Sequence, residues 1–128
     1  MKRLTARWVR KAEADLIGAR ALSRVRPHVP DLTCFHCQQS AEKYLKALMQ
    51  EWAMAAPPRT HDLVAILLLL LPHDATLGKL RRGLRLLNPY AVDIRYPMTD
   101  TTTQEANAAL AQAEKVRAAI RRRLGLPI

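Results

Sequence analysis

The stretch FHCQQSAEKYLKALMQEW, residues 35–52, decides the fold class of this chain. An apolar or amide side chain recurs in it every three or four residues, which is the spacing of one face of an α-helix. A polar set with the same spacing lies almost opposite, at 100° per residue. The first set is Phe35, Gln38, Ala41, Leu45, Leu48 and Trp52, and the second is His36, Gln39, Lys43, Lys46 and Gln50. We therefore predict an amphipathic helix that ends near Ala53 and is capped by Asp31 or Thr33.

Helical signals continue through most of the chain. Apolar residues at helical spacing predict a first helix from about Ala6 to Arg24, in which Asp15 leans onto the apolar face and needs a polar partner. Cap and stop residues mark three further helices, which begin at Thr60, Asp74 and Thr102 and end at Pro72, Asn88 and Gly125. The residues that favour strands are scarce, so the sequence predicts an all-α bundle.

The helix predicted between Thr60 and Pro72 contains the run Leu63–Leu71, which has no polar face. A helix of this kind is buried on all sides. Either the other helices of its own bundle or a second copy of the chain would cover it.

Composition agrees with one helical domain over residues 1–128. The chain is 49% hydrophobic and only 5% aromatic, so Ala and Leu supply most of the core, and both favour helices. Its net charge of +10 indicates an anionic partner, unless the excess reflects coding composition alone. No apolar run approaches the length of about 20 residues that a membrane helix needs. No signal peptide is apparent, and we expect a cytoplasmic protein without membrane contact.

Several stretches share their order with a known family. They read AEADL at 12–16, CQQSAEKYLKA at 37–47, PRTHDL at 58–63 and YAVDIRYP at 90–97. Together they resemble the HEPN domain (higher eukaryotes and prokaryotes nucleotide-binding) across nearly the whole chain. The resemblance implies an up-and-down bundle of four to five helices that forms a homodimer. It also implies a minimal nucleotidyltransferase as partner, in a toxin–antitoxin-like pair.

Several branches of that family are metal-independent ribonucleases, whose signature is an Arg followed by a His after four to six intervening residues. The His residues of this chain are His28, His36, His61 and His73, and none has an Arg at that distance upstream. The chain therefore resembles the branch without the ribonuclease motif, and we assign no catalytic residue. If a reaction occurs on this chain, His61 and Arg95 are the candidates.

Arg95 and Tyr96 are the first candidates for ligand binding. A guanidinium holds phosphate through two hydrogen bonds, and a phenol can stack on a base and bond to a phosphate or ribose. The structural alternative is that Arg95 pairs with Asp15 or Asp93 and fixes the segment before the last helix. Both roles stay open at this point.

Gln39, Lys43 and Lys46 share one polar helical stripe and form the second candidate group. Two ammonium groups and an amide at this spacing either line an anion site or belong to a solvated face. Gln38, on the apolar side, is expected to be a buried hydrogen-bond partner. His61 stands in the first turn of a predicted helix, where free N–H groups favour an anion, although the adjacent Asp62 already supplies negative charge.

We expect neither a metal nor a cofactor. The residues Cys34, His36 and Cys37 invite a metal interpretation, but helical geometry turns His36 away from the two thiols, and a structural zinc site needs four ligands. The cysteines are therefore expected to pack in the core. The basic run 121–123 suits a helix C-terminus and is either solvated or tracks a nucleic-acid backbone.

Three functions follow from these observations. We favour a binding and regulatory protein, a homodimer that binds a nucleotide or RNA phosphate and pairs with a minimal nucleotidyltransferase. The second is a ribonuclease toxin in which His61 is the general acid–base and Arg95 stabilises the developing charge. The third is a structural adaptor whose leucine-rich third helix forms an interface.

Overall fold

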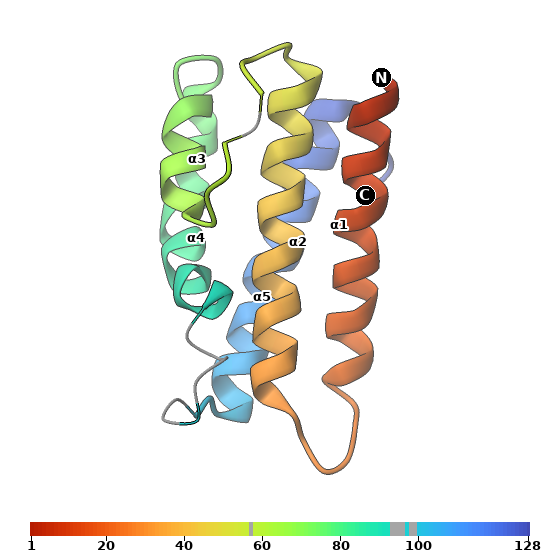
Figure 1. Cartoon of the computed structure of the whole chain (residues 1–128), viewed down its shortest axis with the longest axis vertical. Helices are drawn as coiled ribbons and strands as arrows, with labels where there is room; N and C mark the ends of the chain where they lie inside the picture. Colours follow the sequence, from red (N-terminus) through yellow and green to blue (C-terminus); the bar gives the residue numbers. More distant parts are fainter. Residues whose placement is uncertain (57, 93–96, 98–99) are drawn as a thin grey trace.

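The chain folds as a bundle of five α-helices and two short 3₁₀ helices, with no strand among the residues that the structure describes (Figure 1). The computed structural model describes residues 1–56, 58–92, 97 and 100–128. The α-helices are α1 (Arg3–Leu22), α2 (Pro30–Glu51), α3 (Leu63–Leu70), α4 (Arg81–Leu87) and α5 (Thr103–Leu124). The 3₁₀ helices are η1 (Ala75–Leu80) and η2 (Asn88–Ala91). The predicted all-α fold is confirmed.

Helix α2 is the centre of the bundle. It packs mainly against α1 and α5 and also contacts α3, α4 and η2. In Figure 1, α1 lies on one side of it, α3 and α4 lie on the other, and α5 runs behind. Its polar stripe is therefore covered: Gln39 and Lys43 are half-buried, and Lys46 is only 7% exposed. The alternative of a solvated face on this helix is wrong, because neighbouring helices cover both of its sides.

The core combines small residues on α1 and α5 with leucines on α2, α3 and α4. The alanines on α1 and α5 have small side chains, so these helices can pack closely against α2. Each leucine that is buried contributes about 1.5–3 kcal/mol to the free energy of folding. The fully buried residues include Ala12 and Ala19 on α1, Leu45 and Leu48 on α2, Leu63, Ile66, Leu67 and Leu70 on α3, Leu84 and Leu87 on α4, and Ala109 and Ile120 on α5.

The ends of α5 agree with the sequence prediction. Thr102 and Glu105 form a capping box, in which each side chain accepts a hydrogen bond from the other residue's backbone N–H. Gly125 ends the helix with φ 72°, the left-handed conformation that glycine adopts without strain. Similarly, the Asp74 side chain caps η1, although a short 3₁₀ helix precedes α4 in place of one continuous helix.

Two predicted caps are wrong. Helix α2 begins at Pro30, whose missing N–H is not needed at a first helical position, and its N-cap Val29 provides no side-chain bond. Asp31 instead accepts hydrogen bonds from the backbone N and the hydroxyl of Thr101. Helix α3 is capped by Asp62, which accepts from the backbone N–H groups of the following turn, and not by Thr60.

The bundle of one chain does not bury helix α3 on all sides, so the first of the two predicted ways of covering it is wrong. Leu68 and Leu69 are each 47% exposed, whereas Leu67 and Leu70 are fully buried. One side of this apolar helix therefore faces outward from the bundle. Among the described residues, no helix combines the length and the apolar composition needed to cross a bilayer.

Candidate functional site

Four polar side chains meet between α2 and the segment that precedes α3, around the carboxylate of Glu42, which is 5% exposed. Its Oε1 is 2.8 Å from Nδ1 of His61 and accepts a 3.3 Å hydrogen bond from Nε2 of Gln38. Its Oε2 accepts a 3.0 Å hydrogen bond from Nζ of Lys46. We call Gln38, Glu42, Lys46 and His61 the Glu42 cluster.

The local sequence explains how the Glu42 cluster forms. Gln38, Glu42 and Lys46 are spaced four residues apart, so they lie one above the other on a single face of α2. His61 comes from the connection that leads back from α2 to α3. Nε2 of Gln38 also donates to the backbone carbonyl of His61 at 3.2 Å, which holds that connection against α2. The prediction that Gln38 is a buried hydrogen-bond partner is confirmed.

Burial and hydrogen bonding act in opposite directions on Glu42. Burial alone would raise the pKa of this carboxyl, but hydrogen bonds from His61, Lys46 and Gln38, with the charge of Lys46, hold its pKa below the usual value. The group is thus a carboxylate at neutral pH and can only accept hydrogen bonds. Nδ1 of His61 is therefore the donor, and Nε2 points away from Glu42.

A buried acid thus orients a histidine that faces outward. The His61 side chain is 59% exposed, whereas the Glu42 side chain that holds it is 6% exposed. On the buried side, Nζ of Lys46 lies 5.8 Å from the centroid of the Trp8 ring, at the distance of a cation–π contact. The outward Nε2 of an imidazole held in this way accepts a proton when the ring is neutral and donates to an anion when the ring is protonated.

An open hollow of about 410 Å³ adjoins His61. Its lining residues are His61, Asp62, Asn88, Pro89, Ala91 and Val92. Asn88 holds the polar side of this hollow in place. Its Oδ1 accepts a hydrogen bond from the backbone N of Leu63 at 2.8 Å, and its Nδ2 donates one to Oδ1 of Asp62 at 2.9 Å. Because Asp62 caps α3, His61 precedes this helix. The prediction that His61 lies in the first turn of the helix is therefore wrong. The Asp62 carboxylate already occupies the N–H groups at the start of α3.

Asp15 has the polar partners that its position requires. Its carboxylate accepts a hydrogen bond from Nζ of Lys43 and lies 2.9 Å from Nδ1 of His36. Lys43 is thus bound to a carboxylate between α1 and α2, as Lys46 is in the Glu42 cluster. Arg95, Tyr96 and Asp93 lie outside the described residues.

A third polar group ties α1, α2 and α5 together, and no sequence signal connected its members. The hydroxyl of Tyr44 donates to Glu13 at 2.5 Å, and Nε of Arg117 donates to the same carboxylate at 2.9 Å. Arg121 donates to the Tyr44 oxygen at 3.2 Å. Burial and the adjacent Glu13 carboxylate raise the pKa of Tyr44 to about 12, so its proton stays in place.

The cysteines pack in the core, as predicted. Cys34 and Cys37 are fully buried free thiols, and burial raises their pKa values to about 11 and about 12. His36 is turned towards Asp15. Within the described residues, no group of three or more His, Cys, Asp or Glu side chains could hold a metal ion.

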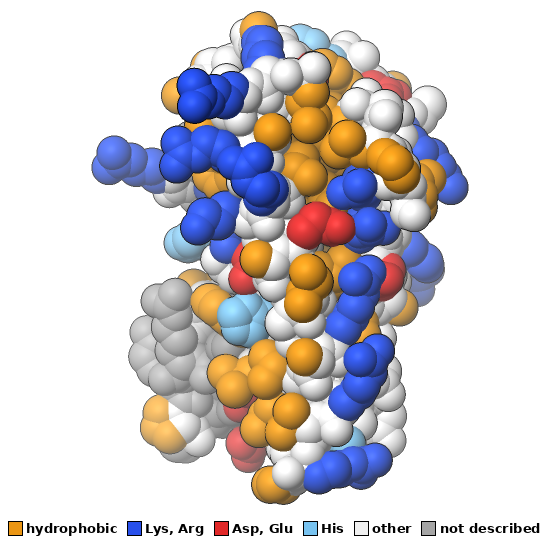
Figure 2. Space-filling model, turned by 90° about the vertical axis from the view of Figure 1, so that its right-hand side faces the viewer, with side chains coloured by type: hydrophobic (Ala, Val, Ile, Leu, Met, Phe, Trp, Pro, Cys, Tyr) orange, Lys and Arg blue, Asp and Glu red, His pale blue; other side chains and the backbone are white. Residues whose placement is uncertain are grey.

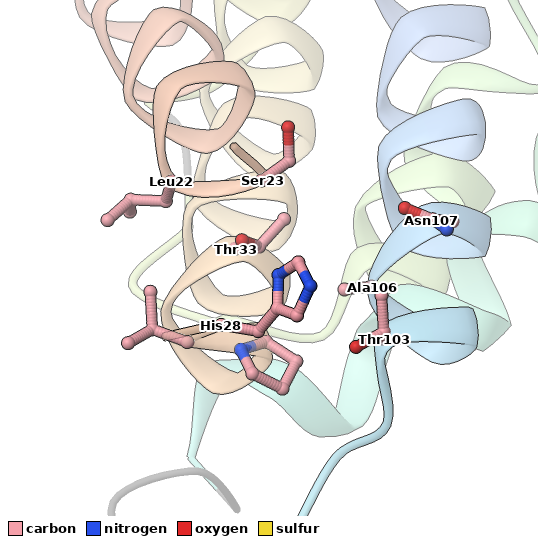
Figure 3. A pocket seen from close by; sticks show the side chains of 9 residues that line it. Leu22, Ser23, His28, Thr33, Thr103, Ala106 and Asn107 are labelled. Carbon is pink, nitrogen blue, oxygen red and sulfur yellow. The ribbon is translucent and has the colours of Figure 1, made fainter. Parts of the chain in front are cut away.

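A small cavity lies where the α1–α2 connection meets the beginning of α5 (Figure 3). The labelled His28 comes from the connection, whereas Thr103, Ala106 and Asn107 come from α5. The cavity measures about 10 Å³ and has room for roughly one water molecule. Its size leaves the hollow beside His61 as the stronger candidate for a ligand.

Comparison with known proteins identifies the relatives of this fold. The model of the HEPN domain family matches residues 5–123. The crystal structure of TT1696 from Thermus thermophilus has a TM-score of 0.80 and 25% sequence identity, covering 95% of this chain and 98% of TT1696. The structure of ST0689, an archaeal HEPN homologue, has a TM-score of 0.75 and 24% identity, covering 96% and 98%. No curated protein matches this sequence.

Proposed function

Since the chain belongs to the HEPN domain family, we propose that it is a nucleotide- or RNA-phosphate-binding homodimer. In this proposal it acts in the cytoplasm beside a minimal nucleotidyltransferase, as part of a toxin–antitoxin-like module. The chain itself performs no chemistry, and binding of a phosphate regulates the pair.

The Glu42 cluster is the observation that carries the ligand-binding proposal. Gln38, Glu42 and Lys46 come from the HEPN-like stretch CQQSAEKYLKA on α2, and His61 comes from the stretch PRTHDL. Ala91 and Val92, at the start of the stretch YAVDIRYP, line the hollow beside His61. Three separate stretches that resemble one family thus meet at one exposed imidazole, which supports a shared binding role.

The proposed ligand contacts follow from exposure and charge. His61 is the exposed member of the Glu42 cluster and would contact the phosphate directly. Lys43 and Lys46 each have a carboxylate partner, so we propose them, with Gln39, at the margin of the site. Arg95 and Tyr96 belong to the HEPN-like stretch YAVDIRYP and are included for that reason.

Thermal unfolding with ATP, GTP and a uridine 12-mer RNA tests the proposal. A ligand that binds the native state stabilises it by about 2.7 kcal/mol at 100 times its Kd. We expect His61→Ala to abolish the shift and His28→Ala, at another exposed imidazole, to leave it unchanged. No shift with any of the three ligands, or an equal loss in both variants, contradicts the proposal.

The exposed side of α3 supports the homodimer. Leu68 and Leu69 leave apolar surface open on a helix whose sequence has no polar face. Light scattering should give the mass of two chains, and Leu68→Glu with Leu69→Glu should reduce it to one. Ile17→Glu on α1, which is 62% exposed, is the matched control and should leave the dimer intact.

Two outcomes would favour the other functions. The Glu42–His61 hydrogen bond is also the arrangement of a general base held by an acid, so it favours a ribonuclease as the second candidate. Cleavage of RNA that His61→Ala abolishes would establish that function, and no cleavage above background removes it. A dimer that binds none of the ligands would instead support the adaptor. The nucleotidyltransferase pairing is tested by co-purifying this chain with a co-expressed minimal nucleotidyltransferase.

A further inference from the structure

A basic groove lies between η1, α4 and α5 and shares no lining residue with the hollow beside His61. It consists of two hollows of about 370 and 200 Å³, both of which Lys79, Leu80 and Lys115 line. Arg122 lines the larger hollow and Arg82 the smaller one, and neither hollow is lined by a carboxylate. We call Lys79, Arg82, Lys115 and Arg122 the groove cations.

The groove cations are not neutralised within the described part of the chain, where none of them forms an ion pair. The sequence explains this, because residues 75–92 and 115–128 contain no Asp or Glu. Other arginines of α5 differ: Arg117 is bound to Glu13, and Arg123 to Asp74. The groove therefore keeps four unpaired positive charges.

A side-chain amide completes the lining. Gln112 lines the smaller hollow, and no hydrogen bond to its amide occurs among the described residues. A Cβ at position 83 would lie 2.2 Å from Oε1 of Gln112, so Gly83 leaves the space that this amide occupies. The amide offers both a donor and an acceptor, which suits a phosphate oxygen or a ribose hydroxyl.

The lining favours a phosphate backbone over an acidic peptide. The apolar residues that line the groove are buried: Leu80, Val116 and Ala119 are 7%, 1% and 3% exposed. They therefore offer little apolar surface to which the side chains of a peptide could bind. No aromatic side chain lines the groove, so bases have nothing to stack on. Lys115 and Arg122 are seven residues apart on α5, about 10 Å along its axis, so the charges can meet successive phosphates.

We propose that this groove binds the sugar–phosphate backbone of RNA, without sequence preference, through the groove cations and Gln112. The inference deepens the proposed function and rests on it for RNA as the ligand. It gives the RNA a contact surface separate from the Glu42 cluster.

Fluorescence anisotropy with a labelled uridine 12-mer at different salt concentrations tests the proposal. Four phosphate contacts predict an affinity that falls about 50-fold between about 50 and 200 mM salt, because each contact releases a counterion. Lys79→Gln with Lys115→Gln leaves two contacts, and the fall should then be only about 7-fold. Arg82→Gln with Arg122→Gln should give the same result.

The matched control removes two exposed cations from another face. Arg7 and Arg10 are both exposed on α1. Figure 2 shows one face of the molecule, on which Lys and Arg side chains surround apolar patches. Arg7→Gln with Arg10→Gln removes the same charge and should leave the salt dependence at about 50-fold.

Each contrary outcome has a distinct meaning. If the groove variants keep the salt dependence of the unmodified protein while His61→Ala abolishes binding, the inference fails and the proposed function stands. If the α1 control changes as much as the groove variants, binding is diffuse and the inference fails. If the unmodified protein does not bind the RNA, both fail. Equal affinity for a glutamate 12-mer overturns the assignment to RNA.

Discussion

Replacing Glu42 by Gln would leave the Lys46 ammonium without its anion inside the bundle. The Lys46 side chain is 9% exposed, and the Glu42 side chain is 6% exposed. The glutamine keeps the shape of the side chain, but one of its terminal atoms becomes an N–H donor. It therefore cannot accept from Lys46 and from His61 as the two carboxylate oxygens do.

The expected cost follows from this burial. Breaking a buried ion pair on one side costs about 3–5 kcal/mol, whereas an exposed i, i+4 pair contributes only about 0.3–0.5 kcal/mol. Because Lys46 also lies over the Trp8 ring, we expect the lower end, about 3 kcal/mol. With an unfolding entropy of about 2.1 cal/mol/K per residue, a chain of 128 residues would lose about 11 °C in Tm.

Urea denaturation at pH 7, followed by circular dichroism, measures the cost. Glu114→Gln is the matched control, because Glu114 pairs with Arg20 at side-chain exposures of 41% and 35% and should lose at most about 1 kcal/mol. Adding Lys46→Met to Glu42→Gln removes the unpaired ammonium and should restore most of the stability. A cost below about 1 kcal/mol for Glu42→Gln, or an equal cost for Glu114→Gln, would refute the assignment of Glu42 as a buried anion with Lys46 as its partner.

Three further predictions rest on separate parts of the structure. Although burial opposes it, hydrogen bonding lowers the pKa of Glu13 in the folded state, so its stabilisation is lost as pH falls through that pKa. Glu13→Gln should flatten the loss of stability between about pH 5 and pH 3 in urea titrations, and an unchanged slope contradicts this. A Cβ added at Gly83 meets the Gln112 amide, so Gly83→Ala should be more favourable in a Gln112→Ala background than in the unmodified protein, by up to about 1 kcal/mol in the free energy of unfolding. Additive effects of the two substitutions would contradict this. Cys34 and Cys37 should react with a thiol reagent at pH 8 only in urea, and rapid labelling of the native protein would disprove their burial.

The fold could be predicted because its signals are local. Spacing along residues 35–52 indicated α2, and Thr102, Glu105 and Gly125 marked the ends of α5. The caps of α2 and α3 were missed because several residues in a row could serve, and only the backbone conformation decides which one does. The sequence left open whether its own bundle or a second copy covers α3, because an apolar helix carries no signal for which side its own bundle covers.

The candidate site was predicted only in part, because its polar contacts join distant residues. His61 and Lys46 were candidates from their own segments, but Glu42 was not, although it binds both. The pairing of Lys43 with Asp15 depends on how α1 packs against α2, and no spacing within either helix reveals it. Of the groove cations, the sequence singled out Arg122 within the basic run 121–123, but it did not reveal the groove, because η1 and α5 are about forty residues apart in the chain and meet only when folded.

The central position of α2 has a consequence for how the molecule opens. Helix α2 contacts every other α-helix of the bundle, so we expect it to be uncovered only when several neighbours separate from it. Amide hydrogens in the middle of α2 should therefore exchange with solvent deuterium only through global unfolding, whereas those of α3 and α4 exchange through smaller fluctuations. We therefore expect the helix that carries Glu42 to be the last part of the bundle to lose its protection.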